Sequence, residues 1–258
     1  MNIDIHFCAT TDGTRIAYGS WGQGESLVWP PGWISNLERW EEQEPAARRF
    51  FERLAQHHTV ITYDRPGSGL SERTRTDFGL DPDLRALEAV VDHAKLRRFT
   101  LFGISAGGPP AIAYAAAHPR RIAKLVLYDT RAHYDAASAE LRLAIGALIR
   151  AHWGLASKTL MEVFIPGATT ALAERFTAHM LATATAQVAS GLWDDAVRLD
   201  VRDLCRRLRV PTLVLHREGD RIAPIHLRRD LAALIPGARF ITLAGDIHGP
   251  DFGDSEAI

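Results

Sequence analysis

Short apolar runs alternate with helix-type patterns along the first half of the chain. Runs rich in β-branched and aromatic residues predict strands at residues 26–29, 59–63, 100–102 and 121–128. Apolar residues at helical spacing predict helices at residues 45–56, 80–96 and 111–117. Residues 6–20 predict a hairpin that turns at Asp12-Gly13, a dipeptide that tolerates positive φ. Together these elements predict an α/β fold with a mostly parallel sheet and an antiparallel N-terminal hairpin.

The alternation of strands and helices stops between residues 131 and 208. This stretch has helical patterns only, with large apolar side chains, and the α/β pattern resumes at residues 210–216. We therefore expect a core made of residues 1–130 and 209–258, with a helical lid (cap) of residues 131–208 inserted after the sixth strand. The alternative is that these helices only pack on one another and on the core.

Composition and charge narrow the choice of partners and compartment. A chain of 258 residues suits one large domain, and 30 Lys+Arg against 31 Asp+Glu leave no net charge that would direct it to nucleic acid or an anionic membrane. The arginine pairs, such as Arg228-Arg229, are scattered, which indicates solvated helix faces. Cys8 and Cys205 have no metal-type spacing, and we see no signal peptide or membrane-length apolar run. We expect a cytoplasmic protein.

The pentapeptide Gly103-Ile104-Ser105-Ala106-Gly107 lies between a predicted strand and a predicted helix. In this setting G-x-S-x-G forms a nucleophile elbow, which lifts the serine hydroxyl above the sheet. Small residues two before and two after Ser105 let the backbones pass. The turn also aims the free N–H of Ala106 at an oxygen that gains charge beside Ser105. An ordinary Gly/Ser turn is the alternative.

Two further candidates follow the last two predicted strands. Asp220 and His248 lie in loops at the same sheet edge as the elbow, and the order Ser105, Asp220, His248 is typical of a catalytic triad on such a sheet. Asp129, after the strand that ends at residue 128, is the competing acid, but the Gly-Asp-Arg turn favours Asp220. The loop 30–33 is expected to supply a second oxyanion donor, the backbone N–H of Trp33, unless it is a plain Pro-Gly turn.

Taken together, these motifs resemble the α/β-hydrolase superfamily over essentially the whole chain. The resemblance rests on GISAGG around Ser105, HREGDRIAP around Asp220, LAGDIHGP around His248, and the loop PPGW. The run YDRPGSGLS and the PPGW loop are most similar to bacterial hydrolase domains found alone or fused to cyclase or regulator modules. Two departures stand out. Pro31-Gly32 replaces the usual His-Gly, and the chain ends ten residues after His248, so the family's terminal helix is expected to be truncated.

The motifs predict a serine esterase. Ser105 attacks the carbonyl carbon, His248 takes and returns the proton, Asp220 orients the imidazole, and the N–H groups of Ala106 and Trp33 hold the oxyanion. This chemistry needs no metal or organic cofactor, and we expect a small or medium acyl ester as substrate. Large side chains of the lid are predicted to line the substrate pocket: Trp153, Phe164, Phe176, Met180 and Trp193.

Other reactions on the same triad stay open, namely those of an amidase, a thioesterase, a carbon–carbon bond hydrolase or a perhydrolase. An alternative from a different class is a sensor that binds a small ligand, turns it over slowly and signals through lid movement to a fused or separate regulatory partner. Rapid turnover of simple aryl esters by the isolated chain distinguishes the enzyme from the sensor.

Overall fold

A single sheet organises the chain. The computed structural model describes residues 3–38, 45–222, 224–251 and 255–258. Within these ranges eight strands pair in the order β1-β2-β4-β3-β5-β6-β7-β8. The strands are β1 (Asp4–Ala9), β2 (Arg15–Gly22), β3 (Glu25–Trp29), β4 (His58–Tyr63), β5 (Phe99–Ile104), β6 (Ile122–Tyr128), β7 (Thr212–Arg217) and β8 (Arg239–Leu243). β1 pairs antiparallel with β2, and β2 with β4, while the other pairs are parallel. The predicted mostly parallel sheet with an antiparallel N-terminal hairpin is confirmed.

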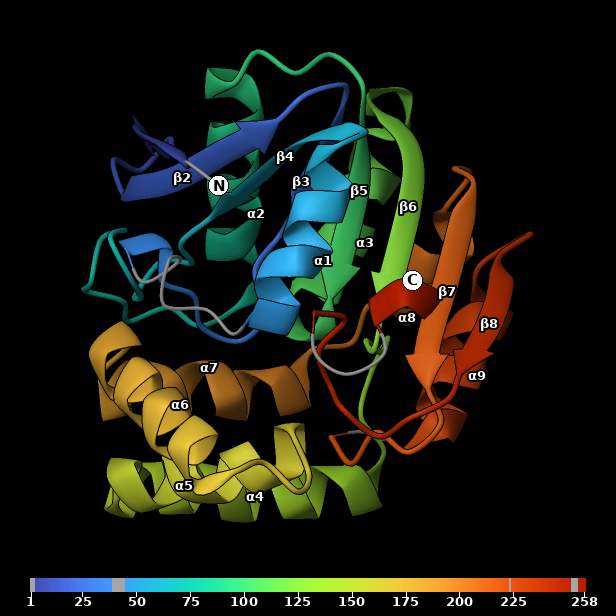
Figure 1. The fold of residues 1–258 in the computed structure, drawn as a ribbon. Coiled ribbons are helices and arrows are strands. Elements are labelled where there is room, and N and C mark those ends of the chain that lie inside the picture. Colours follow the sequence, from blue (N-terminus) through green and yellow to red (C-terminus); the bar gives the residue numbers. More distant parts are fainter. Residues whose placement is uncertain (1–2, 39–44, 223, 252–254) are drawn as a thin grey trace.

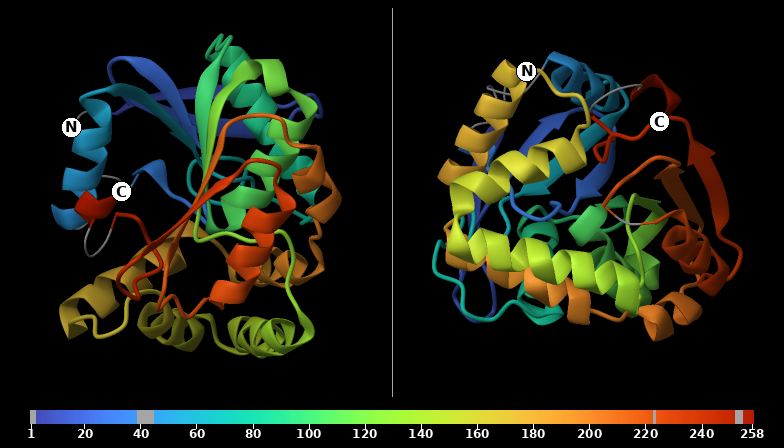
Figure 2. Two further views of the ribbon diagram at one scale, coloured as in Figure 1. Left: turned by 90° about the vertical axis from the view of Figure 1, so that its right-hand side faces the viewer. Right: turned by 90° about the horizontal axis from the view of Figure 1, so that it is seen from below.

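Helices cover both faces of this sheet (Figures 1 and 2). One face carries α2 (Leu80–His93), α3 (Gly108–Ala117), α8 (Arg202–Arg207) and α9 (Ile225–Leu234), and the other carries α1 (Pro45–Ala55). Every residue of β5 is buried, because this central strand is covered on both sides. The elbow therefore follows a strand that is buried along its whole length.

Four longer helices lie beyond the carboxyl ends of the parallel strands (Figure 1). They are α4 (Ala136–Ala151), α5 (Trp153–Phe164), α6 (Thr170–Thr183) and α7 (Ala186–Arg198). Local sequence explains where α4, α6 and α7 begin, because Asp135, Thr169 and Thr185 each accept a backbone N–H from the first turn. These four helices, residues 136–198, thus form a helical insertion after β6. The predicted range 131–208 also includes α8, which packs with α3 and α9 on the face of the sheet. The action of the insertion as a lid stays a prediction.

A buried ion cluster joins the loop after β4 to α2. Asp83 accepts a hydrogen bond from Arg65 Nε and another from Arg75 Nη1, each at 2.8 Å. Burial alone would raise the pKa of Asp83, but the two guanidinium groups outweigh it and hold that pKa at about 2.

The described C-terminal residues form a short turn beside the first helix. After His248 the structure describes residues 249–251 and a short turn, η4 (Ser255–Ala257), which packs beside α1. Residues 252–254, where the predicted terminal helix would begin, lie outside the described residues. Among the helices described, none is both long enough and apolar enough to cross a bilayer.

Candidate active site

Ser105 is held in a left-handed backbone conformation directly after β5. Its φ is +48°, which is uncommon for a residue other than glycine and is found at strained functional positions. The short turn η2 (Ser105–Gly107) then leads into α3. The hydroxyl of Thr130 donates a 2.6 Å hydrogen bond to the carbonyl oxygen of Ser105, which ties the strained peptide to the loop after β6. The strand-turn-helix setting predicted for the elbow is present.

The glycines of the motif are required by close backbone approach. A Cβ atom at Gly103 would lie 2.8 Å from Cβ of Ala111, and one at Gly107 would lie 2.6 Å from the carbonyl oxygens of both Pro30 and Pro31. The contact at Gly107 also shows that the loop 30–33 runs beside the elbow. The two residues predicted as oxyanion donors, Trp33 and Ala106, belong to one buried apolar cluster here. Their backbone roles stay predictions.

Ser105, His248 and Asp220 form a continuous hydrogen-bonded chain. The Ser105 hydroxyl lies 2.8 Å from His248 Nε2, and His248 Nδ1 lies 2.9 Å from Asp220 Oδ2. Asp220 Oδ1 also accepts the backbone N–H of Ile222 at 2.8 Å. Burial alone would raise the pKa of Asp220, but the imidazole of His248 and the guanidinium of Arg228 outweigh it and hold that pKa below its ordinary value. The loops after β7 and β8 thus bring the predicted acid and base to the predicted nucleophile.

Asp129, the competing acid, contacts a different histidine. Its Oδ1 accepts hydrogen bonds from His216 Nδ1 at 2.7 Å and from the backbone N–H of Arg217 at 3.1 Å. Asp129, His216 and Asp220 place one ligand atom each within 4.8 Å of one another, as a metal site would. The guanidinium of Arg228 already contacts Asp220, however, and a fixed positive charge there opposes a cation. We therefore interpret this cluster as a support for the hydrogen-bonded chain of Ser105, His248 and Asp220.

Arg228 is the residue of this site that sequence reasoning missed. The prediction that the Arg228-Arg229 pair faces solvent is wrong for Arg228, which is 1% exposed, while Arg229 is exposed. Its Nη2 donates to Asp220 Oδ2 at 2.9 Å and to the carbonyl oxygen of Asp129 at 3.3 Å. The signal was its spacing, because Arg228 lies three residues before the buried Leu231 and so on the same face of α9.

A pocket of about 240 Å³ opens beside Ser105 and His248. Three of the five side chains predicted to bind substrate line it: Phe164, Phe176 and Met180. The described lining does not include Trp153 or Trp193. These two rings pack against Trp33 instead, with ring centroids 5.7 and 4.8 Å from it. Sequence alone does not separate the two sets, because all five are large apolar residues of the insertion.

The helical insertion also contacts His248. The backbone N–H of His248 donates to the carbonyl oxygen of Phe164 at 2.9 Å, and the two rings stack with centroids 5.5 Å apart. Asp251 lies on the pocket wall near His248, and burial raises the pKa of this carboxyl group to about 6. Neither the double contact of Phe164 nor the position of Asp251 has a signal in the sequence.

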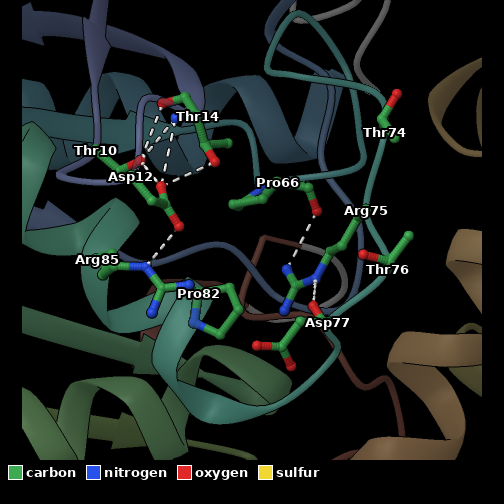
Figure 3. A pocket seen from close by; sticks show the side chains of 10 residues that line it. All are labelled: Thr10, Asp12, Thr14, Pro66, Thr74, Arg75, Thr76, Asp77, Pro82 and Arg85. Carbon is green, nitrogen blue, oxygen red and sulfur yellow. Dashed lines mark hydrogen bonds and ion pairs between the residues drawn. The ribbon is translucent and has the colours of Figure 1, made fainter.

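A second, polar pocket of about 150 Å³ lies between the N-terminal hairpin turn, the loop after β4 and the start of α2 (Figure 3). Its charged groups bond to one another and to backbone. Asp12 pairs with Arg85 at 3.0 Å, and Arg75 Nε donates to the carbonyl oxygen of Asp77 at 2.8 Å. The lining contains no Ser-His pair, so we place the chemistry at the first pocket.

Comparison with known proteins agrees with the geometry. A family model described as alpha/beta hydrolase fold matches residues 25–249, a span that includes the whole hydrogen-bonded chain. The chain belongs to this family. It is 26% identical to a non-heme haloperoxidase of Rhodococcus erythropolis over 94% of this chain and 92% of that protein. It is 23% identical to the bifunctional esterase/perhydrolase DCH of Acinetobacter calcoaceticus over 98% of this chain and 96% of that protein.

A solved structure shows the same fold at lower identity. The esterase EaEST from Exiguobacterium antarcticum superposes with a TM-score of 0.85 at 22% identity, covering 97% of this chain and 95% of that one. The match to the family model confirms the resemblance to the superfamily, and the chain is an enzyme of the α/β-hydrolase class. Fusion to a cyclase or regulator module stays a prediction.

Proposed function

We propose that this chain is a serine hydrolase that cleaves carboxylic esters through an acyl-enzyme on Ser105. His248 accepts the hydroxyl proton as Ser105 attacks the carbonyl carbon, and then donates it to the leaving alcohol. Asp220 orients the imidazole and stabilises its cation, while the N–H groups of Ala106 and Trp33 stabilise the oxyanion. Water then attacks the acyl-enzyme with the same base and releases the acid.

One observation carries the proposal, the unbroken chain from Ser105 Oγ to His248 Nε2 at 2.8 Å and from His248 Nδ1 to Asp220 at 2.9 Å. These distances suit a nucleophile, a base and an orienting acid before any substrate binds. The pocket supports a small or medium acyl chain. Its volume of about 240 Å³ lies below the usual range for ligand pockets, and its walls are mainly apolar.

The test is a panel of aryl esters of increasing acyl length, run with a serine-directed phosphonate probe. Ser105→Ala is expected to abolish probe labelling and to lower turnover by about a million-fold, because the triad acts as a unit. Ser157→Ala is the matched control, since this hydroxyl is buried but bonds only to its own helix, at Trp153 O. Labelling of the Ser105→Ala protein would overturn the assignment.

Perhydrolysis is the second candidate, because one relative is named as a bifunctional esterase/perhydrolase and another as a haloperoxidase. In this reaction hydrogen peroxide replaces water as the acyl acceptor. One peroxide oxygen bonds to the acyl carbon, the bond to Ser105 Oγ breaks, and the serine recovers its proton through His248. Formation of peroxy acid from an ester and hydrogen peroxide, lost in Ser105→Ala, tests it directly.

The sensor hypothesis stays a separate prediction. It requires an acyl-enzyme or ligand complex that decays slowly, so steady-state turnover of the best aryl ester far below about 1 s⁻¹ would favour it over the hydrolase. Fast turnover with the same ester would leave the hydrolase as the better account.

A further inference from the structure

Two nitrogen donors share one oxygen of Asp220. His248 Nδ1 and Arg228 Nη2 each lie 2.9 Å from Oδ2, so the imidazole and the guanidinium are within about 6 Å of each other. Asp220 and Arg228 are both buried, which keeps solvent from screening the interaction. Arginine stays charged at any working pH, whereas the imidazole gains a charge only when it binds a proton.

We propose that Arg228 is a positioning residue, which holds Asp220 and keeps His248 free to accept a proton at mildly acidic pH. The inference rests on the proposed hydrolase function. An aspartate alone beside a histidine favours the protonated imidazole, which is unable to act as a base. The guanidinium shares the same carboxylate oxygen and repels a second positive charge. It therefore offsets part of the effect of Asp220 on His248.

Other titratable or charged groups face this trio from each neighbouring element. They are Asp129 after β6, His216 on β7, Arg131 before α4, Arg142 on α4, and His179 and Asp251 on the wall of the pocket that His248 lines. All of them are the same in the wild-type protein and in a variant at position 228. A difference between the two proteins therefore reports the guanidinium of Arg228.

The expected effect follows from the separation of the two charges. At about 6 Å and an effective dielectric constant of about 20, removal of the guanidinium favours protonation of His248 by about 2 pH units, and relaxation of the site reduces this to 1–2 units. In Arg228→Met we expect the acid limb of the kcat/KM profile to move up by that amount. The rate on the alkaline plateau should not fall by more than tenfold, because the imidazolium formed near the transition state loses a repelling charge. KM should change little, since no group that touches substrate is altered.

The experiment compares four proteins, wild type, Arg228→Met, Arg228→Lys and Arg75→Met. Arg228→Lys keeps the charge and should restore the wild-type acid limb. Arg75→Met is the matched control, because it removes another buried guanidinium, one that contacts Asp83 and the polar pocket in Figure 3 instead of the triad. Its acid limb should stay at the wild-type position. Thermal unfolding shows which variants are folded.

The titration of His248 is measured in parallel by NMR of the imidazole protons, which needs no turnover. An upward shift in Arg228→Met but not in Arg75→Met supports the inference even if the ester assay fails, so failure of the proposed function is seen separately. Equal titration of His248 in wild type and Arg228→Met overturns it, as does an equal shift in Arg75→Met. Arg228→Gln keeps a donor to Asp220 without a charge, and it must show the same shift if the methionine variant does not fold.

Discussion

Replacement of Asp220 by asparagine tests the acid with almost no change in shape. Oδ2 of Asp220 accepts hydrogen bonds from both His248 and Arg228, while Oδ1 accepts one from Ile222 N. An asparagine can keep its oxygen toward His248 and Arg228 and lose only the bond to the backbone of Ile222. We therefore expect the His248 imidazole to keep its tautomer and its orientation, so that the variant loses only the negative charge of Asp220.

The magnitude follows from the distance between the acid and the base. With 2.9 Å between His248 Nδ1 and Asp220 Oδ2, the attraction between imidazolium and carboxylate is about 6 kcal/mol at an effective dielectric constant of about 20. This charge pair exists only while His248 holds the proton of Ser105, near the transition state. Its loss lowers kcat by about four orders of magnitude, with little change in KM.

Asp129→Asn is the matched control. Asp129 is as deeply buried as Asp220, but its carboxylate bonds to His216 and to the backbone of Arg217. We expect this variant to lose about 1–3 kcal/mol of stability and less than tenfold in kcat. Both variants are assayed on one aryl ester, with urea unfolding to separate stability from rate. A large loss of kcat in Asp129→Asn together with near wild-type kcat in Asp220→Asn would refute the choice of Asp220 as the acid.

Five further substitutions, in three experiments, test other parts of the molecule. Gly32→Val should lower kcat/KM more than Pro31→His, because a valine side chain at position 32 would fill pocket space that the substrate needs. The reverse ranking on one ester would contradict this placement of Gly32 beside the substrate. Phe176→Ala should move the optimal acyl length toward longer esters, while Trp153→Ala, outside the pocket lining, should leave it unchanged. If both variants kept the wild-type preference for acyl length, the insertion would cover the pocket without selecting the substrate. Asp83→Leu should cost about 3–5 kcal/mol in urea unfolding at pH 7, since two buried arginines lose their carboxylate. The two arginines outweigh the effect of burial and hold the pKa of Asp83 at about 2, below its ordinary 3.8. The wild-type protein should therefore lose about 2 kcal/mol of stability as pH falls from about 4 toward 2, and a flat unfolding free energy over that window would refute the assignment.

Features that depend on neighbouring residues in the chain could be predicted from the sequence. The turn at Ser105 is one, because Gly103 and Gly107 are needed wherever a strand turns sharply into a helix. The positions of Asp220 and His248 are another, because loops after parallel strands meet at the same edge of a sheet. In both cases a local pattern and a general rule of sheet topology are sufficient.

Features that depend on which helix face meets which surface could not be predicted. Phe164 and Trp193 are both large and apolar, yet one lines the pocket and the other packs on Trp33. Arg228 and Arg229 are adjacent and chemically identical, yet only Arg228 is buried. The difference arises when α9 packs against the sheet. Periodicity indicates that Arg228 lies on the packed face of α9, but it does not indicate that the carboxylate of Asp220 lies there as its partner.

The two buried carboxylates at this sheet edge show why the acid could be named while its environment could not. Asp129 and Asp220 follow neighbouring strands, β6 and β7, and Arg228 bonds to the backbone carbonyl of the first and the carboxylate of the second. Each carboxylate has its own histidine, and the histidine it reaches decides its role. His216 is buried on β7 away from the pocket lining, whereas His248 faces Ser105. If Asp220 is the acid, loss of its charge must slow the reaction at Ser105 far more than loss of the charge on Asp129, which is the contrast that the paired asparagine variants measure.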